Sequence, residues 1–218
     1  MNRLRLFPLA STVLFPGMDL PLVVFEDRYR QLVAECLAES EPFGVLLIKE
    51  GREVGGGAVT HPVGTTARLR SVQPAADGRL QVVARGERRF RIIEPYLDRP
   101  YLSARVEYPV DEISPLSEAS VERARASYRQ IERLRQTMEG LYTRDSRMPE
   151  SPGALADAIA ATTAVVIVPE RLQALLEMFD IRQRFDAASE LLGDVVELTH
   201  RRAQMVVAQR WGGIERRN

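Results

Sequence analysis

Three residue types that carry much protein chemistry are scarce in this sequence: its 218 residues include one cysteine, Cys36, one lysine, Lys49, and two histidines. A single cysteine excludes a disulfide framework within the chain and leaves too few thiolates for a structural zinc site. The histidines, His61 and His200, lie in different halves, and neither has a second histidine or a cysteine at metal-ligand spacing. His61 is expected in a loop and His200 on a solvated helix face. We therefore expect a reducing compartment, no metal and no other cofactor.

The single lysine argues against two classes of enzyme. A phosphate-binding loop of the Walker type needs Gly-Lys-Ser or Gly-Lys-Thr, whereas Lys49 stands between Ile48 and Glu50. A Ser-Lys hydrolase needs its lysine beside a serine, and Lys49 ends an apolar run typical of a strand. The glycine triplet at 55–57 lacks the strand-to-helix surroundings of a dinucleotide site, and Cys36 occupies a helical core position typical of a packed thiol. We predict that the chain is not an enzyme.

Excess charge and long apolar runs are also absent. The 30 basic and 30 acidic residues cancel, so no overall field would concentrate the protein on nucleic acid or anionic lipid, although a local basic face stays open. The longest apolar runs, near residues 20–25 and 164–168, fall far short of the roughly 20 residues that cross a bilayer. Residues 1–9 carry no long apolar segment of an export signal. We expect a cytoplasmic protein without a membrane partner, and the sequence does not indicate its oligomeric state.

The first half of the chain consists of short apolar runs punctuated by glycine and proline, which predicts strands and turns. Asp77 and Gly78 supply the backbone conformation of a tight hairpin turn. From Phe25 to Leu37, apolar residues recur on one face at spacings of three and four, which predicts one helix. The predicted strands cover residues 4–8, 20–24, 43–49, 63–72, 80–93 with a break at Gly86, and 102–108.

The second half shows helical periodicity after a connector at residues 109–117. Its first apolar stripe has arginines and glutamates on the opposite face, as expected of a solvated surface. The predicted helices cover 121–141, 154–161, a segment that begins at Pro169, and a segment capped by Asp180 that runs to Leu198, with a continuation toward Trp211 left open. We predict two domains, a β domain at residues 1–112 and a helical domain at 113–218.

The densest charged segment is residues 85–91, which could meet phosphates on one strand face, with Phe90 available for stacking on bases. Strand alternation offers a second account. In that account Phe90 and Ile92 face the core, while Arg89 and Arg91 lie on the other face and pair with nearby acids.

A string of motifs in residues 7–29 carries a resemblance to a known family. The motifs are Phe7-Pro8-Leu9, Leu14-Phe15-Pro16-Gly17-Met18, Leu20-Pro21-Leu22 and Phe25-Glu26-Asp27-Arg28-Tyr29, followed by Val63-Gly64-Thr65, Asp77-Gly78-Arg79, Arg89-Phe90, Pro100-Tyr101 and Leu172-Gln173. Together they closely resemble the N-terminal substrate-binding domain of the Lon ATP-dependent proteases.

The resemblance implies an α+β fold: an N-terminal β pseudo-barrel of the PUA-like, Lon N-terminal type with one helix, followed by a C-terminal helical bundle. In the full-length proteases this region is followed by an ATPase module and a Ser-Lys protease module. The present sequence ends at Asn218 without either, which predicts a free-standing relative without the family's proteolysis.

The matched motifs give seven candidate binding residues: Phe15, Met18, Glu26, Arg28, Tyr29, Arg89 and Tyr101. Each also has a structural interpretation. Phe15, Phe25, Tyr29 and Phe90 are most simply core aromatics. Glu26 or Asp27 suits a helix N-terminus, and Arg28 can pair with a carboxylate.

These observations leave three functions to weigh. The first is a non-catalytic polypeptide-binding or adaptor module whose partners are unfolded or specific protein substrates, with a separate protease as a possible further partner. The second is an RNA-binding protein that uses a PUA-like barrel, which the zero net charge argues against. The third, an unrecognised hydrolase, would need convergent titratable groups that the sequence spacing does not show. An exposed apolar patch would favour the first function, because unfolded chains are recognised largely by apolar contact.

Overall fold

The structure, a computed structural model, describes residues 3–53, 57–139, 148–164, 166–193 and 195–196. It divides into two compact units, the first formed by Met1–Glu112 with Ile167–Phe179 and the second by Ile113–Val166 with Asp180–Asn218. The division predicted from the sequence and the division in the structure both separate the chain after residue 112. They differ at Ile167–Phe179, which the sequence analysis placed in the helical domain and the structure groups with the β-rich unit.

Among its described residues, the first unit contains seven strands and two helices. Six of the strands lie where the apolar runs predict them, and β4 is a two-residue strand that the sequence analysis did not predict. The strands are β1 (Arg3–Leu9), β2 (Asp19–Val24), β3 (Phe43–Glu50), β4 (Val59–Thr60), β5 (Val63–Pro74), β6 (Leu80–Tyr96) and β7 (Ser103–Glu107). The helices are α1 (Asp27–Glu39) and α4 (Pro169–Leu176).

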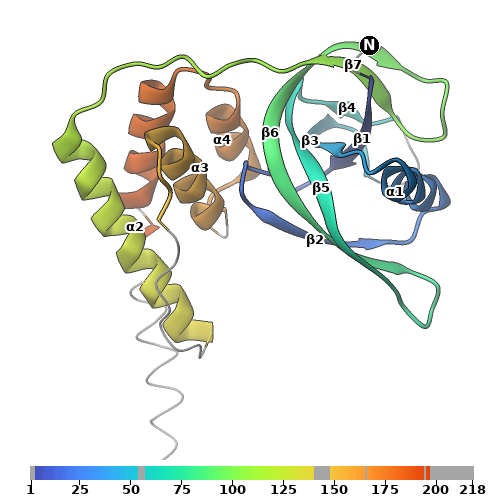
Figure 1. Cartoon of the computed structure of the whole chain (residues 1–218), viewed down its shortest axis with the longest axis horizontal. Coiled ribbons are helices and arrows are strands. Elements are labelled where there is room, and N and C mark those ends of the chain that lie inside the picture. Colours follow the sequence, from blue (N-terminus) through green and yellow to red (C-terminus); the bar gives the residue numbers. More distant parts are fainter. Residues whose placement is uncertain (1–2, 54–56, 140–147, 165, 194, 197–218) are drawn as a thin grey trace, which may run out of the picture. The chain divides into compact units, whose positions relative to one another are not determined.

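The strands form a ring rather than a regular barrel. Neighbouring strands follow the order β1-β7-β6-β5-β3, and parallel pairing of β1 with β3 closes the ring. Strand β4 extends from β3, and β2 pairs with β6 outside the ring path. Figure 1 shows β5 and β6 curving side by side and continuing as a long hairpin. The predicted α+β class and pseudo-barrel are confirmed.

The hairpin turn between β5 and β6 is the one that its Asp-Gly pair predicts. Gly78 has a φ of 81°, and the Ala75 N–H donates to the Arg79 carbonyl at 2.8 Å. Asp77 accepts a hydrogen bond from the Arg79 N–H at 3.1 Å. Positive φ costs glycine little, and the aspartate side chain bonds its own turn, so the chain reverses here without strain.

The predicted break at Gly86 is wrong, because β6 runs through it without interruption. A Cβ at Gly86 would lie 2.3 Å from the Phe15 carbonyl oxygen. The Gly17 N–H donates to the Gly86 carbonyl at 2.8 Å, and the Gly86 N–H donates to the Met18 carbonyl at 2.9 Å. The glycine thus marks a close approach of two backbones, and not the end of a strand.

The ring encloses a core to which α1 contributes one apolar face. Tyr29, Leu32, Val33 and Cys36 are the buried residues of the helix, and the Tyr29 ring stacks on Phe7 at 4.1 Å between centroids. Phe15, Tyr29 and Phe90 are core aromatics, as predicted. Phe25 is not: it precedes α1 and is 55% exposed, because the buried stripe of the helix begins four residues later.

Helix α4 is bonded to β5 through one buried amide. Leu172, Leu175 and Leu176 are buried, and the Gln173 side chain donates to the Val63 carbonyl at 3.0 Å. Gln173 also donates to Glu177 at 2.8 Å, and Glu177 lies 3.2 Å from the Nδ1 atom of His61. These contacts explain why residues 167–179 belong to this unit.

The second unit contains α2 (Glu118–Glu139), α3 (Pro152–Thr163) and a helix at residues 181–193 that is also assigned at 195–196. Ala124, Tyr128 and Ile131 of the predicted stripe are buried. The Asp180 carboxylate caps the last helix by accepting the Gln183 N–H at 2.8 Å, as predicted. Buried Arg184 lies 3.2 Å from Asp157 of α3. The predicted continuation through Leu198 and toward Trp211, with His200, lies outside the described residues.

We expect Gly86→Ala to lower the free energy of unfolding by about 1–3 kcal/mol, because the new methyl group meets the Phe15 backbone rather than a side chain that can move aside. Gly193→Ala is the control, since an added Cβ there meets nothing within 4 Å and alanine is the better helix former. Urea unfolding measures both changes. Equal stability of Gly86→Ala and the wild type would contradict this account of the glycine.

Candidate functional site

Two of the candidate residues build the turn that leads into β2. Phe15 is fully buried, and Met18 packs against the main core cluster. The Met18 N–H donates to the Phe15 carbonyl at 3.1 Å, across Gly17 with its φ of 81°. Both side chains therefore serve the core and the turn.

Three more candidates lie at the start of α1. Arg28 donates from Nε to the Glu26 carboxylate at 3.0 Å and from Nη2 to the Glu53 carbonyl at 2.9 Å. Its guanidinium also lies 4.5 Å from the centroid of the Tyr29 ring. Burial raises the pKa of Tyr29, so its hydroxyl stays protonated. Arg28 thus ties residue 53 to the start of α1.

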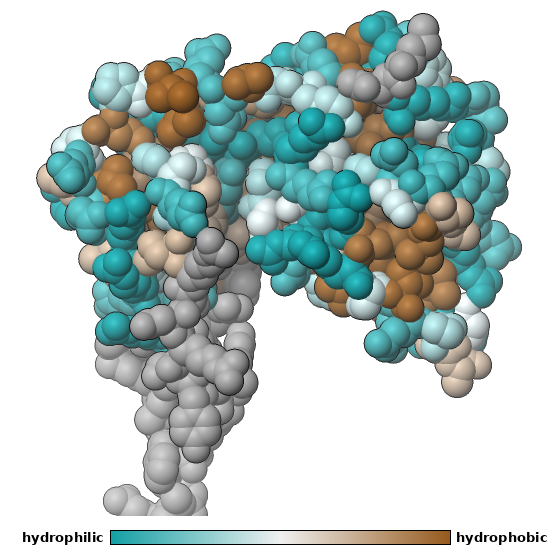
Figure 2. Space-filling view, viewed as in Figure 1, coloured by the Kyte–Doolittle hydropathy of each residue, from teal (hydrophilic) through white to brown (hydrophobic). Residues whose placement is uncertain are grey.

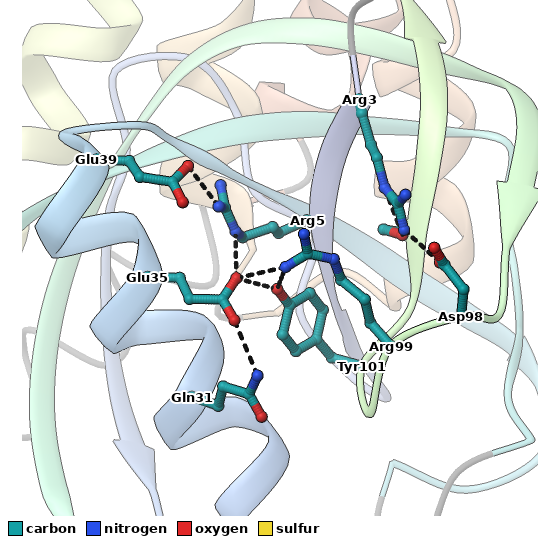
Figure 3. Close-up of polar contacts among 9 residues, drawn as sticks. Arg3, Arg5, Gln31, Glu35, Glu39, Asp98, Arg99 and Tyr101 are labelled. Carbon is teal, nitrogen blue, oxygen red and sulfur yellow. Dashed lines mark hydrogen bonds and ion pairs between the residues drawn. The ribbon is translucent and has the colours of Figure 1, made fainter.

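Tyr101 belongs to a polar network around Glu35, shown in Figure 3. The Tyr101 hydroxyl donates to the Glu35 carboxylate, which also accepts from Arg5 at 3.0 Å and from Arg99 at 2.7 Å. Gln31 donates to its second oxygen at 2.9 Å. The network joins β1, α1 and the segment before β7. Sequence analysis singled out Tyr101 but none of its partners, which lie far apart in the chain.

The network holds Glu35 ionised. Hydrogen bonding from Tyr101, with help from Gln31, Arg5 and Arg99, lowers the pKa of Glu35 to about 2. Burial, and the same bond to Glu35, raise the pKa of Tyr101. The two shifts keep the proton on the phenol, so this pair is a structural clamp and not an acid–base couple.

Arg85, Arg89 and Arg91 pair with carboxylates, whereas exposed Arg88 lies 3.5 Å from the centroid of the Tyr108 ring. Arg89 is 7% exposed and lies 3.5 Å from Asp111, and Arg91 lies 2.9 Å from Glu107. Arg85 pairs with Asp19 at 2.8 Å. Phe90 is fully buried. The strand-alternation account is confirmed for Phe90, and the stacking and phosphate contacts that RNA would need are not supported.

Two further reactive side chains, Cys36 and His61, lie in the β-rich unit. Burial raises the pKa of the Cys36 thiol to about 11, which leaves it protonated. His61 lies in the loop between β4 and β5, as expected, and contacts Glu177. Across the described ranges, no group of three or more histidine, cysteine, aspartate or glutamate residues could hold a metal ion. The same ranges contain no helix that is both long and apolar enough to cross a membrane.

The sequence analysis missed an exposed face of β2, β6 and β5, which we call the open face. Strand register aligns its side chains in two rows, Pro21 with Val83 and Ser71, and Val23 with Gln81 and Gln73. A groove of about 370 Å³ lies along them. The open face is these six residues, Pro21, Val23, Ser71, Gln73, Gln81 and Val83.

The open face is uncharged and partly apolar. Val23 is 54% exposed and Val83 is 37% exposed, and exposed Phe25 follows directly after β2. Figure 2 shows a hydrophobic area on this unit, bordered by hydrophilic residues. In a strand with one buried side, the outward positions are usually polar. Apolar Pro21 and Val23 at outward positions could therefore have indicated an exposed apolar face from the sequence.

The ring of strands, the helix that packs one face on their core and the helical second unit define a protein of the Lon N-terminal type. The sequence matches the family described as the ATP-dependent protease La (LON) substrate-binding domain over residues 3–194. The chain therefore belongs to this family.

Similar proteins agree with the family. The chain is 32% identical over 194 residues to Lon protease 2 of Myxococcus xanthus, covering 87% of this chain and 23% of that protein. It is 32% identical over 202 residues to Lon protease of Methylocella silvestris, covering 90% and 24%. The chain thus spans about a quarter of the length of these relatives.

Two solved structures share the fold. A Lon N-terminal domain protein from Xanthomonas campestris gives a TM-score of 0.61 at 26% identity and covers 85% of this chain and 96% of that one. The N-terminal domain of Mycobacterium avium complex Lon protease gives a TM-score of 0.65 at 21% identity, covering 88% and 99%.

We expect Tyr101→Phe to lower the free energy of unfolding by about 1–2 kcal/mol at pH 7, because Glu35 loses the bond that most depresses its pKa. A carboxylate whose pKa is lower in the folded than in the unfolded state stabilises the fold at pH values above its unfolded-state pKa. This stabilisation is lost as the pH falls toward the pKa of the folded state. The difference between variant and wild type should therefore shrink between about pH 5 and pH 2.

Denaturant unfolding at several pH values measures this effect. Tyr96→Phe is the matched control, since the Tyr96 hydroxyl makes only an exposed 3.5 Å bond to Glu94. A Tyr101→Phe difference that stays constant across this pH range would contradict the assigned role of Glu35.

Proposed function

We propose that this protein is a non-catalytic polypeptide-recognition module that contacts its partners through the open face and Phe25. The family to which the chain belongs is described as a substrate-binding domain, which supports a recognition role. The single observation that carries the assignment to this surface is its lack of charge, in a chain of which 28% of the residues are charged.

The chemistry of the open face fits unfolded polypeptide. Apolar Pro21, Val23 and Val83 offer area that is stabilised on burial, and the amides of Gln73 and Gln81 offer donors and acceptors without net charge. Arg85 and Asp19 neutralise one another next to the rows. An apolar centre bordered by paired charges resembles the composition of protein interfaces.

The small area implies weak binding. Burying a valine or phenylalanine side chain contributes about 1.5–3 kcal/mol, and here each of the exposed side chains is already partly covered. After the cost of ordering the partner, the expected dissociation constant is on the order of 0.01–1 mM. Weak, rapidly reversible contact suits a module that samples many protein substrates, with or without a separate protease. We also propose a cytoplasmic location, because the one cysteine is buried and unpaired.

The test is fluorescence anisotropy with a labelled, permanently unfolded, uncharged polypeptide, beside a structured RNA of similar mass at two salt concentrations. We expect saturable binding to the polypeptide that changes little with salt, since the contact involves no phosphate. Binding to RNA alone, lost as salt rises, would replace this proposal with nucleic-acid recognition.

Variants locate the surface. Phe25→Ala combined with Val83→Thr should weaken binding to the polypeptide about tenfold, because both remove exposed apolar area. Leu97→Ala is the matched control, since Leu97 is 86% exposed but lies between β6 and β7, outside the open face. An equal loss with Leu97→Ala, or no loss with the double variant, would remove the open face from the proposal.

A further inference from the structure

Strand β2 has one free edge. Its residues pair with β6 in antiparallel register from Asp19↔Arg85 to Val24↔Leu80. Within the part of the chain that the structure describes, no strand pairs with the other edge of β2. The open face therefore ends at a row of main-chain groups available to another strand.

The register identifies which groups point outward. The Gly86 N–H bonds to the Met18 carbonyl, which continues the residue pairing of β2 with β6. Hydrogen-bonded pairs alternate along an antiparallel ladder, so Leu20, Leu22 and Val24 bond to β6. The main-chain groups of Asp19, Pro21 and Val23 point to the free edge. They supply three carbonyl acceptors but two N–H donors, because proline has none.

We propose that an extended polypeptide segment adds to this edge as a further strand. The inference rests on the proposed function and gives it a mode: the main chain of the partner bonds to Asp19, Pro21 and Val23, and its alternate side chains continue the rows of the open face. Main-chain bonding tolerates many sequences. The uncharged rows select segments in which apolar and small polar residues occupy the positions beside Pro21 and Val23.

A second copy of this chain fits the edge less well than an unfolded segment does. Pairing of β2 with another β2 would bring two prolines into one ladder and remove two donors, whereas a segment without proline meets only Pro21. A pair of β2 strands would also contain two Asp19 carboxylates, whose like charges repel one another. Proline and charge on an edge are the usual means by which proteins limit pairing between copies.

Two substitutions at one position separate main-chain bonding from side-chain contact. Val23→Pro removes the outward N–H without removing a bond to β6, whereas Val23→Ala keeps the N–H and shortens the side chain. We expect Val23→Pro to bind the labelled uncharged polypeptide about three- to tenfold more weakly than Val23→Ala.

Amide hydrogen exchange of the wild-type protein supplies a readout that does not depend on how the variants fold. Saturating polypeptide should slow exchange at the Val23 amide at least about tenfold, while the Asp77 amide in the hairpin turn stays unchanged. Sedimentation run alongside reports the association state.

The outcomes distinguish this inference from the proposed function. If wild type binds polypeptide but Val23→Pro equals Val23→Ala and the Val23 amide stays unprotected, strand addition is overturned and side-chain recognition remains. If the wild-type protein does not bind polypeptide, both the proposed function and strand addition are contradicted. If Val23 is protected without polypeptide in a dimer, the occupant is a second copy and the inference is wrong.

Discussion

The contact between Gly86 and the Phe15 backbone is the constraint on which the rest of the β-rich unit depends. With no side chain at Gly86, the turn at residues 15–18 approaches β6 closely enough to exchange hydrogen bonds with it. That approach sets the register in which β2 meets β6. The register in turn determines that Leu20 and Val24 face the core while Pro21 and Val23 face outward beside Val83. A backbone contact thus decides the composition of the exposed face.

The arginines of this unit serve its structure. Arg5 and Arg99 converge on Glu35, Arg28 fastens the start of α1, and Arg85 and Arg91 each pair with a carboxylate across a strand pair. Three of the four arginines at residues 85–91 are thus paired with carboxylates, and Arg88 is exposed. The six residues of the open face carry no charge. Because these arginines form ion pairs within the unit, we expect recognition at the open face to depend on apolar contact and main-chain hydrogen bonds.

Elements with a strong local signal could be predicted from the sequence. The strands, the Asp-Gly hairpin, α1 and the cap at Asp180 follow from periodicity and turn chemistry. Contacts between distant segments could not. The strand break at Gly86 was an error because glycine marks a backbone approach as readily as a strand end. The amide of Gln173 joins α4 to the β-rich unit over a separation that no local pattern spans. Phe25 was assigned to the core because aromatics are usually buried, and the six residues of the open face become one surface only through strand register.

Of the seven candidate residues, the structure brings Phe15 and Met18 together in one turn and Glu26, Arg28 and Tyr29 at another site, and each has a structural role. Their role in binding stays a prediction.

The central claim is that polypeptide contacts the open face. Backbone amide chemical shifts of the isotope-labelled protein, followed while an unfolded, uncharged polypeptide is added, test it most directly. The account predicts that shifts concentrate at Val23, Phe25, Gln81 and Val83 and that Arg89, Arg91 and Tyr101 change little. Shifts confined to the arginines of β6 or to the network around Glu35 would contradict it.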